Sequence, residues 1–179
     1  MPVFARVPDD VQRLVAPFLQ GMPWEDVDLF VQPIPQAKAP TAIVIEADLF
    51  YPHALRAVAM AVGTDIYIDP AFADFNTAAG LALLVHEGVH VVQHLNIPNF
   101  LLEYNRANQG VPDDRPWENV YEGQAYAWEC AAFDHYVSLG IPPGPWLPLG
   151  KAMGFCPSLG QPNLPAFAFQ QMGEYALVA

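Results

Sequence analysis

The pattern of apolar and polar positions predicts short strands in the first part of the chain. Residues 28–32 (DLFVQ) and 41–46 (TAIVIE) are compact runs of β-forming residues. Residues 64–69 (TDIYID) alternate between polar and apolar positions, and Gly63 and Pro70 bound them. Each run is too short for a typical helix, so the three together predict a small sheet.

The strongest helix prediction covers about residues 77–95 (TAAGLALLVHEGVHVVQHL). Asn76 or Thr77 can cap its start, and Asn96 with Pro98 can end it. This helix is apolar on nearly every side, which is typical of a helix buried inside a domain.

Other segments have weaker helix signals, and one long segment is predicted to be a loop. Helices are expected at residues 9–20, 52–61, 98–108 and 116–139, with a short one around 166–177. Residues 140–165 are rich in Pro and Gly and are expected to form a C-terminal loop region. The order of elements predicts one α+β domain over residues 1–179. Its small mixed sheet lies beside the 77–95 helix, and the 116–139 helix forms the facing wall.

Composition narrows the possible partners. Of the 179 residues, 53% are hydrophobic, and the net charge is −12. Such an acidic surface repels nucleic acid and anionic membranes, so neither is expected as a partner. The N-terminal segment lacks the basic start and apolar stretch of a signal peptide, so a cytoplasmic location is the default, with export by a non-classical route as the alternative. The two cysteines, Cys130 and Cys156, are expected to be buried thiols rather than a bridge.

The buried helix carries a motif with metal chemistry, His86-Glu87-Gly88-Val89-His90. Residues four apart share a helix face, so the two imidazoles can converge on one zinc ion. Glu87 flanks the same stripe and can act as a base on a zinc-activated water. The alternative is a pair of structural histidines in a metal-free domain. Three ionisable groups on one buried apolar helix are costly unless they share a binding partner. The motif therefore favours a zinc site over structural histidines.

A zinc site needs a third protein ligand. His94 continues the four-residue spacing, but it lies about 12 Å along the helix axis from His86, too far to share one ion. Acidic residues of the 116–139 helix remain, because two histidines and one glutamate form a known catalytic set. Spacing alone leaves three candidates open: Glu118, Glu122 and Glu129. His53 and His135 lack a motif and are expected to have ordinary structural roles.

These residues resemble a known family. Over about residues 8–130 the sequence looks like the zincin metallopeptidases of the gluzincin type, and most like a small bacterial zincin domain found in proteins linked to contractile injection systems. The segments that carry the resemblance are 7–10 (VPDD), 61–68 (AVGTDIYI), 83–93 (LLVHEGVHVVQ) and 121–126 (YEGQAY).

The resemblance implies roles for further residues. Glu122 opens the Glu-x-x-Ala segment and is implied as the third ligand. An edge strand is implied to lie along a bound peptide by strand addition, and it consists of Thr64, Asp65, Ile66, Tyr67 and Ile68. Gly88 stands where the family usually has a larger apolar residue, which predicts close packing there. Tyr126 follows Glu122 by four, where members often carry an Asp that orients a ligand histidine.

The implied activity is zinc-dependent hydrolysis of peptide bonds, with a peptide or protein as substrate. Glu87 is expected to be the general base, and Tyr126, Tyr104 or His94 is expected to assist. The alternative function is a non-catalytic zinc-binding module that binds a partner or stabilises the fold.

Overall fold

The computed structural model describes residues 3–19, 21–33, 58–111, 116–154 and 156. The predicted strand at 41–46 and the predicted helix around 166–177 lie outside these ranges. Within them the fold is α+β, as the sequence predicted.

A four-stranded mixed sheet forms one layer of the domain. Its spatial order is β1-β2-β4-β3, and only the β2–β4 pair is parallel. The strands are β1 (Val3–Arg6), β2 (Asp28–Val31), β3 (Ala59–Val62) and β4 (Asp65–Ile68). The predictions at 28–32 and 64–69 are therefore confirmed to within a residue or two.

The helix predicted at 52–61 is wrong where the structure describes that segment. Ala59–Val62 form β3, which pairs antiparallel with β4 so that Val62 lies opposite Asp65. Two residues, Gly63 and Thr64, make the turn, and Gly63 has a positive φ of 65° as tight hairpin turns require. Cross-strand pairing outweighs the helical preference of the alanines and methionine in this segment.

The position predicted for the substrate strand also needs correction. β4 is not an edge strand, because it pairs with β2 on one side and with β3 on the other. Thr64 belongs to the turn, and residues 65–68 use both of their backbone edges within the sheet. A peptide cannot add to Thr64–Ile68 as an extra strand. Among the described residues, β3 is the edge on this side of the sheet.

Two long helices carry the rest of the core. α2 (Ala78–Asn96) begins where the Thr77 hydroxyl accepts a hydrogen bond from the Gly80 amide, which is the predicted cap. α4 (Val120–Ser138) follows a short 3-10 turn at Pro116–Glu118 and is capped by Asn119. A second 3-10 turn covers Trp24–Asp26. The shorter helices are α1 (Asp9–Val15), α3 (Phe100–Ala107) and α5 (Leu149–Met153). α5 lies inside the region expected to be loop.

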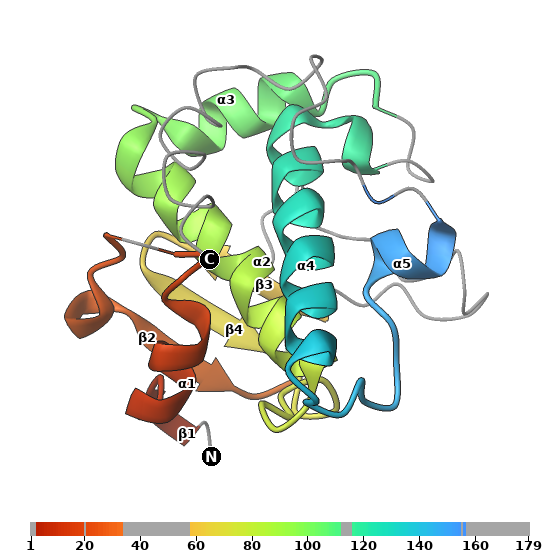
Figure 1. The fold of residues 1–179 in the computed structure, drawn as a ribbon. Helices are drawn as coiled ribbons and strands as arrows, with labels where there is room; N and C mark the ends of the chain where they lie inside the picture. The colour runs from red at the N-terminus through yellow and green to blue at the C-terminus, as the bar shows by residue number, and fades with distance from the viewer. Residues whose placement is uncertain (1–2, 20, 34–57, 112–115, 155, 157–179) are drawn as a thin grey trace.

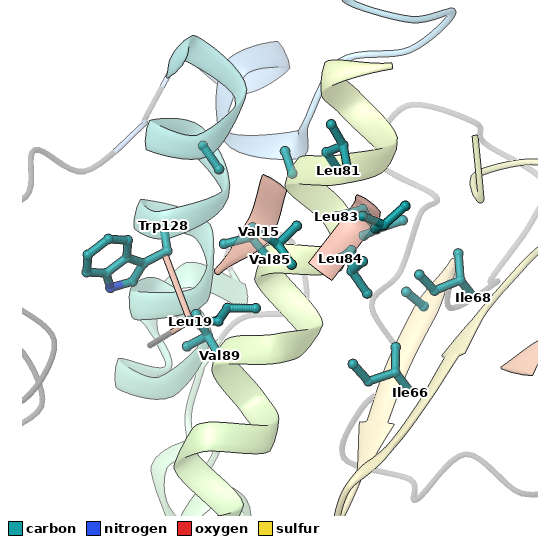
Figure 2. Close-up of a cluster of buried hydrophobic side chains, with 14 of the residues drawn as sticks. Val15, Leu19, Ile66, Ile68, Leu81, Leu83, Leu84, Val85, Val89 and Trp128 are labelled. Carbon is teal, nitrogen blue, oxygen red and sulfur yellow. The ribbon is translucent and has the colours of Figure 1, made fainter. Parts of the chain in front are cut away.

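α2 lies between the sheet and α4, and it contacts both (Figure 1). Apolar side chains fill the space on each side of this helix (Figure 2). Ile66 and Ile68 of β4 face Leu84 on one side, while Trp128 of α4 lies on the other. A helix covered on both sides must be apolar all round, which explains its sequence.

Glycines let α2 approach its neighbours closely. A Cβ atom at Gly88 would lie 2.3 Å from Cδ1 of Leu19, so the predicted close packing at Gly88 is confirmed. A Cβ atom at Gly80 would lie 2.1 Å from the carbonyl oxygen of Asp74. Both contacts are shorter than any real carbon side chain tolerates. Glycine at these points therefore sets how closely the chain packs on α2.

Cys130 of α4 forms a disulfide with Cys156, so the expectation of two free thiols is wrong. Their Cα atoms are 5.9 Å apart although 26 positions separate them in sequence. The turn after α4 and the short helix α5 return the chain to the middle of α4 (Figure 1). Nothing in the two cysteines' local sequence signals this return. No helix within the described ranges is long and apolar enough to cross a membrane.

Candidate metal centre

The centre lies where α2 and α4 run antiparallel. Near the end of α2, Gln93 contacts the first turn of α4; near its middle, His86 contacts Glu129, further along α4. Between these contacts, Glu122 faces both His86 and His90. The helical period places His86 and His90 on one face of α2, and this face is turned toward α4.

The three side chains offer three ligand atoms at metal-site spacing. Nε2 of His86 is 3.4 Å from Oε2 of Glu122, and Nε2 of His90 is 3.3 Å from its Oε1. One ligand atom from each residue lies within 4.8 Å of the other two. Ligands held at 2.0–2.1 Å around a tetrahedral zinc are about 3.3 Å apart, so the spacing fits that ion. All three residues are buried.

Hydrogen bonds fix the orientation of the His90 ring. The Gln93 amide nitrogen donates to the Tyr121 carbonyl at 3.1 Å and to Oε1 of Gln124 at 2.9 Å. Oε1 of Gln93 therefore faces His90, and it lies 2.8 Å from Nδ1. An amide oxygen only accepts, so Nδ1 of His90 carries the hydrogen. The neutral ring then presents the lone pair of Nε2 toward Glu122.

Hydrogen bonds from residues outside the group also orient His86 and Glu122. Nδ1 of His86 lies 3.2 Å from Oε2 of Glu129. The Tyr104 hydroxyl of α3 donates to Oε1 of Glu122 at 2.6 Å. Each of the three candidate ligands thus has a hydrogen-bond partner on its outer side. Partners in these positions are a regular feature of metal sites, because they orient the ligands.

Two atoms at the centre of the group have no hydrogen-bond partner within the described ranges. Nε2 of His86 and Oε2 of Glu122 are buried, and neither has a hydrogen-bond partner among the described residues. They nevertheless face each other at 3.4 Å. A buried lone pair opposite a buried carboxylate oxygen is unfavourable unless a proton or a metal ion lies between them. The arrangement therefore fits a metal ion, and its nitrogen and oxygen ligands suit zinc.

The electrostatics of the group point in the same direction. Burial alone would raise the pKa of Glu122, but the two histidines hold it well below its ordinary value. Burial works against charge on His86 as well, yet Glu122 and Glu129 raise its pKa well above the usual value. The pKa of His90 is also raised, because Glu122 outweighs the effect of burial. The site attracts positive charge, whether as protons or as a metal ion.

Glu87 is buried beside the group without belonging to it. Burial raises the pKa of Glu87 to about 7, although His86 and His90 pull it down. Its Oε2 atom has no hydrogen-bond partner in the described part of the chain. A carboxyl group with a pKa near neutrality can both take up and release a proton.

The remaining candidates from the sequence take other places. Glu118 is exposed and outside the group. The His94 ring packs against Phe100 with 4.6 Å between ring centroids. The Tyr126 ring packs against His86 at 4.7 Å. His135 packs against aromatic rings near α1, while His53 lies outside the described residues.

Sequence reasoning missed two of the orienting residues. Gln93 and Gln124 are both buried and hydrogen-bonded to each other. Gln93 did offer a signal, because it is a polar residue three positions after His90 on a helix that is otherwise apolar. A buried amide at that spacing needs partners.

Comparison with known protein families gives a match to part of the chain. Residues 51–97 match the eCIS core domain, where eCIS stands for extracellular contractile injection system. The match includes β3, β4 and α2 with both histidines, and it ends before Glu122. It supports the predicted link to contractile injection systems. No curated protein and no solved structure matches the chain.

Proposed function

We propose that the protein is a zinc-dependent peptidase of the zincin class, gluzincin type, with His86, His90 and Glu122 as zinc ligands. The observation that carries this proposal is the buried group of these three residues, each hydrogen-bonded on its outer side. A motif helix that provides two histidines, with a glutamate from a second helix, is the ligand set of a catalytic zinc site that keeps one position open.

Bound zinc would lower the pKa of a water molecule and polarise a carbonyl group. Glu87 would then take a proton at its unpartnered Oε2 as water attacks a peptide carbonyl. It would return the proton to the leaving amine, which suits a pKa of about 7. Its buried surroundings keep bulk water away from this exchange.

The substrate strand is proposed to be β3 instead of Thr64–Ile68. β3 is the edge of the described sheet, and its Met60 packs in a small cluster with Phe100 and Tyr104. Tyr104 in turn donates to Glu122. A peptide that pairs with β3 would therefore lie beside the wall of the metal centre.

The match to the eCIS core domain supports association with a contractile injection system. Such a system would provide the non-classical export route that the sequence allows. The disulfide between Cys130 and Cys156 is consistent with work in an oxidising compartment outside the cell.

The test is a zinc measurement combined with cleavage of a broad peptide library. We expect about one zinc per chain and cleavage by the parent protein. Glu87→Gln keeps the three ligands, so zinc should remain while cleavage falls by about 10²–10⁴-fold, as is typical of a lost general base. Zinc binding without cleavage by the parent would instead favour a non-catalytic module. If the parent and Glu87→Gln cleave equally well, the activity does not come from this site.

A further inference from the structure

Glu129 is a buried carboxylate with few polar neighbours. It lies on α4, is 3% exposed, and its Oε2 is 3.2 Å from Nδ1 of His86. The ion pairs formed by Lys and Arg within the described ranges join other carboxylates, those of Glu103 and Asp134. Within the part of the chain that the structure describes, the Glu129 carboxylate therefore has His86 as its hydrogen-bond partner.

A neutral imidazole is a weak partner for a buried carboxylate. It offers a single hydrogen bond, whereas an ionised carboxylate loses strong hydration when it is buried. The ring becomes a much stronger donor when a cation binds its other nitrogen. Nε2 of His86 faces Glu122, is buried, and has no hydrogen-bond partner among the residues that the structure describes. A cation at Nε2 would therefore account for both the unpartnered nitrogen and the buried carboxylate.

We propose that Glu129 is a positioning residue for the metal centre, an inference that rests on the proposed zinc site. Glu129 accepts the Nδ1 hydrogen of His86, which fixes the ring's tautomer and its rotation. The lone pair of Nε2 is thereby directed into the group formed with His90 and Glu122.

The arrangement of α4 explains why the carboxylate comes from residue 129. Residues 122, 126 and 129 recur at the helical period, so they share the face turned toward α2. The middle position holds Tyr126, whose ring packs edge-on against His86 at 4.7 Å between centroids. Glu122 and Glu129 are about 10 Å apart along the axis. The His86 ring lies between them with one nitrogen facing each carboxylate.

The experiment compares two replacements of Glu129 with a control on the same helix. Glu129→Gln keeps the shape and an acceptor oxygen but removes the charge, while Glu129→Met removes the acceptor as well. Asp134→Asn removes one charge from an exposed position of α4. Zinc dissociation constants are measured by chelator competition. We expect binding about 10–100-fold weaker for the Met variant, a smaller loss for the Gln variant, and no change for the control.

A second measurement separates positioning from a general structural role. In zinc-loaded parent protein, ¹⁵N-resolved NMR of the histidine rings should show a slowly exchanging hydrogen on Nδ1 of His86. That signal should persist in Glu129→Gln and disappear in Glu129→Met. A lower unfolding temperature with unchanged zinc affinity in both variants would overturn the proposal and leave the zinc site standing. If Glu129→Met does not fold, parent-like zinc affinity in Glu129→Gln alone overturns it. Failure of the parent to bind zinc would overturn the proposed function itself.

Discussion

Glu122 and Glu118 are four residues apart, yet only Glu122 reaches the histidines of α2. Replacing Glu122 with Ala removes one of three proposed ligands, so zinc should be lost on dialysis. The same change at exposed Glu118 should leave zinc content intact. Zinc added to the parent should also raise its unfolding temperature, because the proposed site exists only in the folded state. Glu122→Ala should show no such rise. Full zinc content in Glu122→Ala would contradict the ligand assignment.

The sequence alone predicted part of this site. Helical spacing placed His86 and His90 on one face, because that relation is local. Spacing could not choose among the glutamates of the second helix, and only the family resemblance pointed to Glu122. The role of Glu129 depends on how α2 and α4 are aligned against each other. That alignment is set by packing between distant parts of the chain, which no local pattern encodes.

At the scale of elements, two glycines of α2 pack closely against different kinds of neighbour. Gly80 lies against backbone, and Gly88 lies against a side chain. In an unhindered helix, Gly→Ala stabilises by up to about 1 kcal/mol. At Gly80 the new methyl group would meet the Asp74 carbonyl oxygen, which also accepts a hydrogen bond from the Thr77 hydroxyl. Gly80→Ala should therefore destabilise by about 2 kcal/mol, through overpacking and a disturbed cap.

Gly88→Ala is the matched comparison, because the atoms nearest to its methyl group belong to the Leu19 side chain and not to backbone. That side chain can shift, so the loss should be smaller, about 1 kcal/mol or less. Urea denaturation of both variants measures the difference. Stabilisation by Gly80→Ala would show that the turn before α2 adjusts without cost.

Tyr136 joins α4 to α1 through one hydrogen bond, in which its hydroxyl donates to the Leu14 carbonyl at 2.9 Å. Tyr136→Phe should lower the free energy of unfolding by about 1 kcal/mol. Burial raises the pKa of Tyr136 above its ordinary value. The unfolded chain therefore ionises first, and the stabilisation is complete below about pH 10 and declines above it. Denaturation curves from pH 8 to 11 should show the parent and the variant converging. A constant difference would contradict this.

Among the elements, the sequence predicted the long helices better than the sheet. α2 has a cap, an end signal and one continuous apolar surface, all within its own residues. β3 has none of these, since Ala59–Val62 also suit a helix. Their strand conformation comes from pairing with β4, and the interior place of β4 comes from its parallel pairing with β2. Both are relations between segments, so local propensity could not reveal them.

At the scale of the whole molecule, two links connect α4 to other parts of the chain, and both are called ties below. The proposed zinc ion would join it to α2, and the disulfide joins it to the chain beyond α5. Cys130 follows Glu129 directly, so the two ties meet in the same turn of the helix. The orienting contact of Glu129 with His86 lies on the side facing α2. The buried face of α4 packs on α2, and this packing does not depend on the disulfide. The disulfide should therefore stabilise the fold without determining the positions of the metal ligands.

This independence can be tested with the double variant Cys130→Ala, Cys156→Ala. A bridge spanning 26 positions restricts the unfolded chain enough to contribute about 3 kcal/mol. The double variant should therefore have a free energy of unfolding lower by about that amount. Its zinc affinity should stay within about twofold of the parent, because the packing of α4 on α2 holds Glu129 beside His86 without the bridge. Denaturation and chelator competition on the same samples measure both. A large loss of zinc affinity would show that the disulfide holds Glu129 in place, and that the two ties are coupled through this turn of α4.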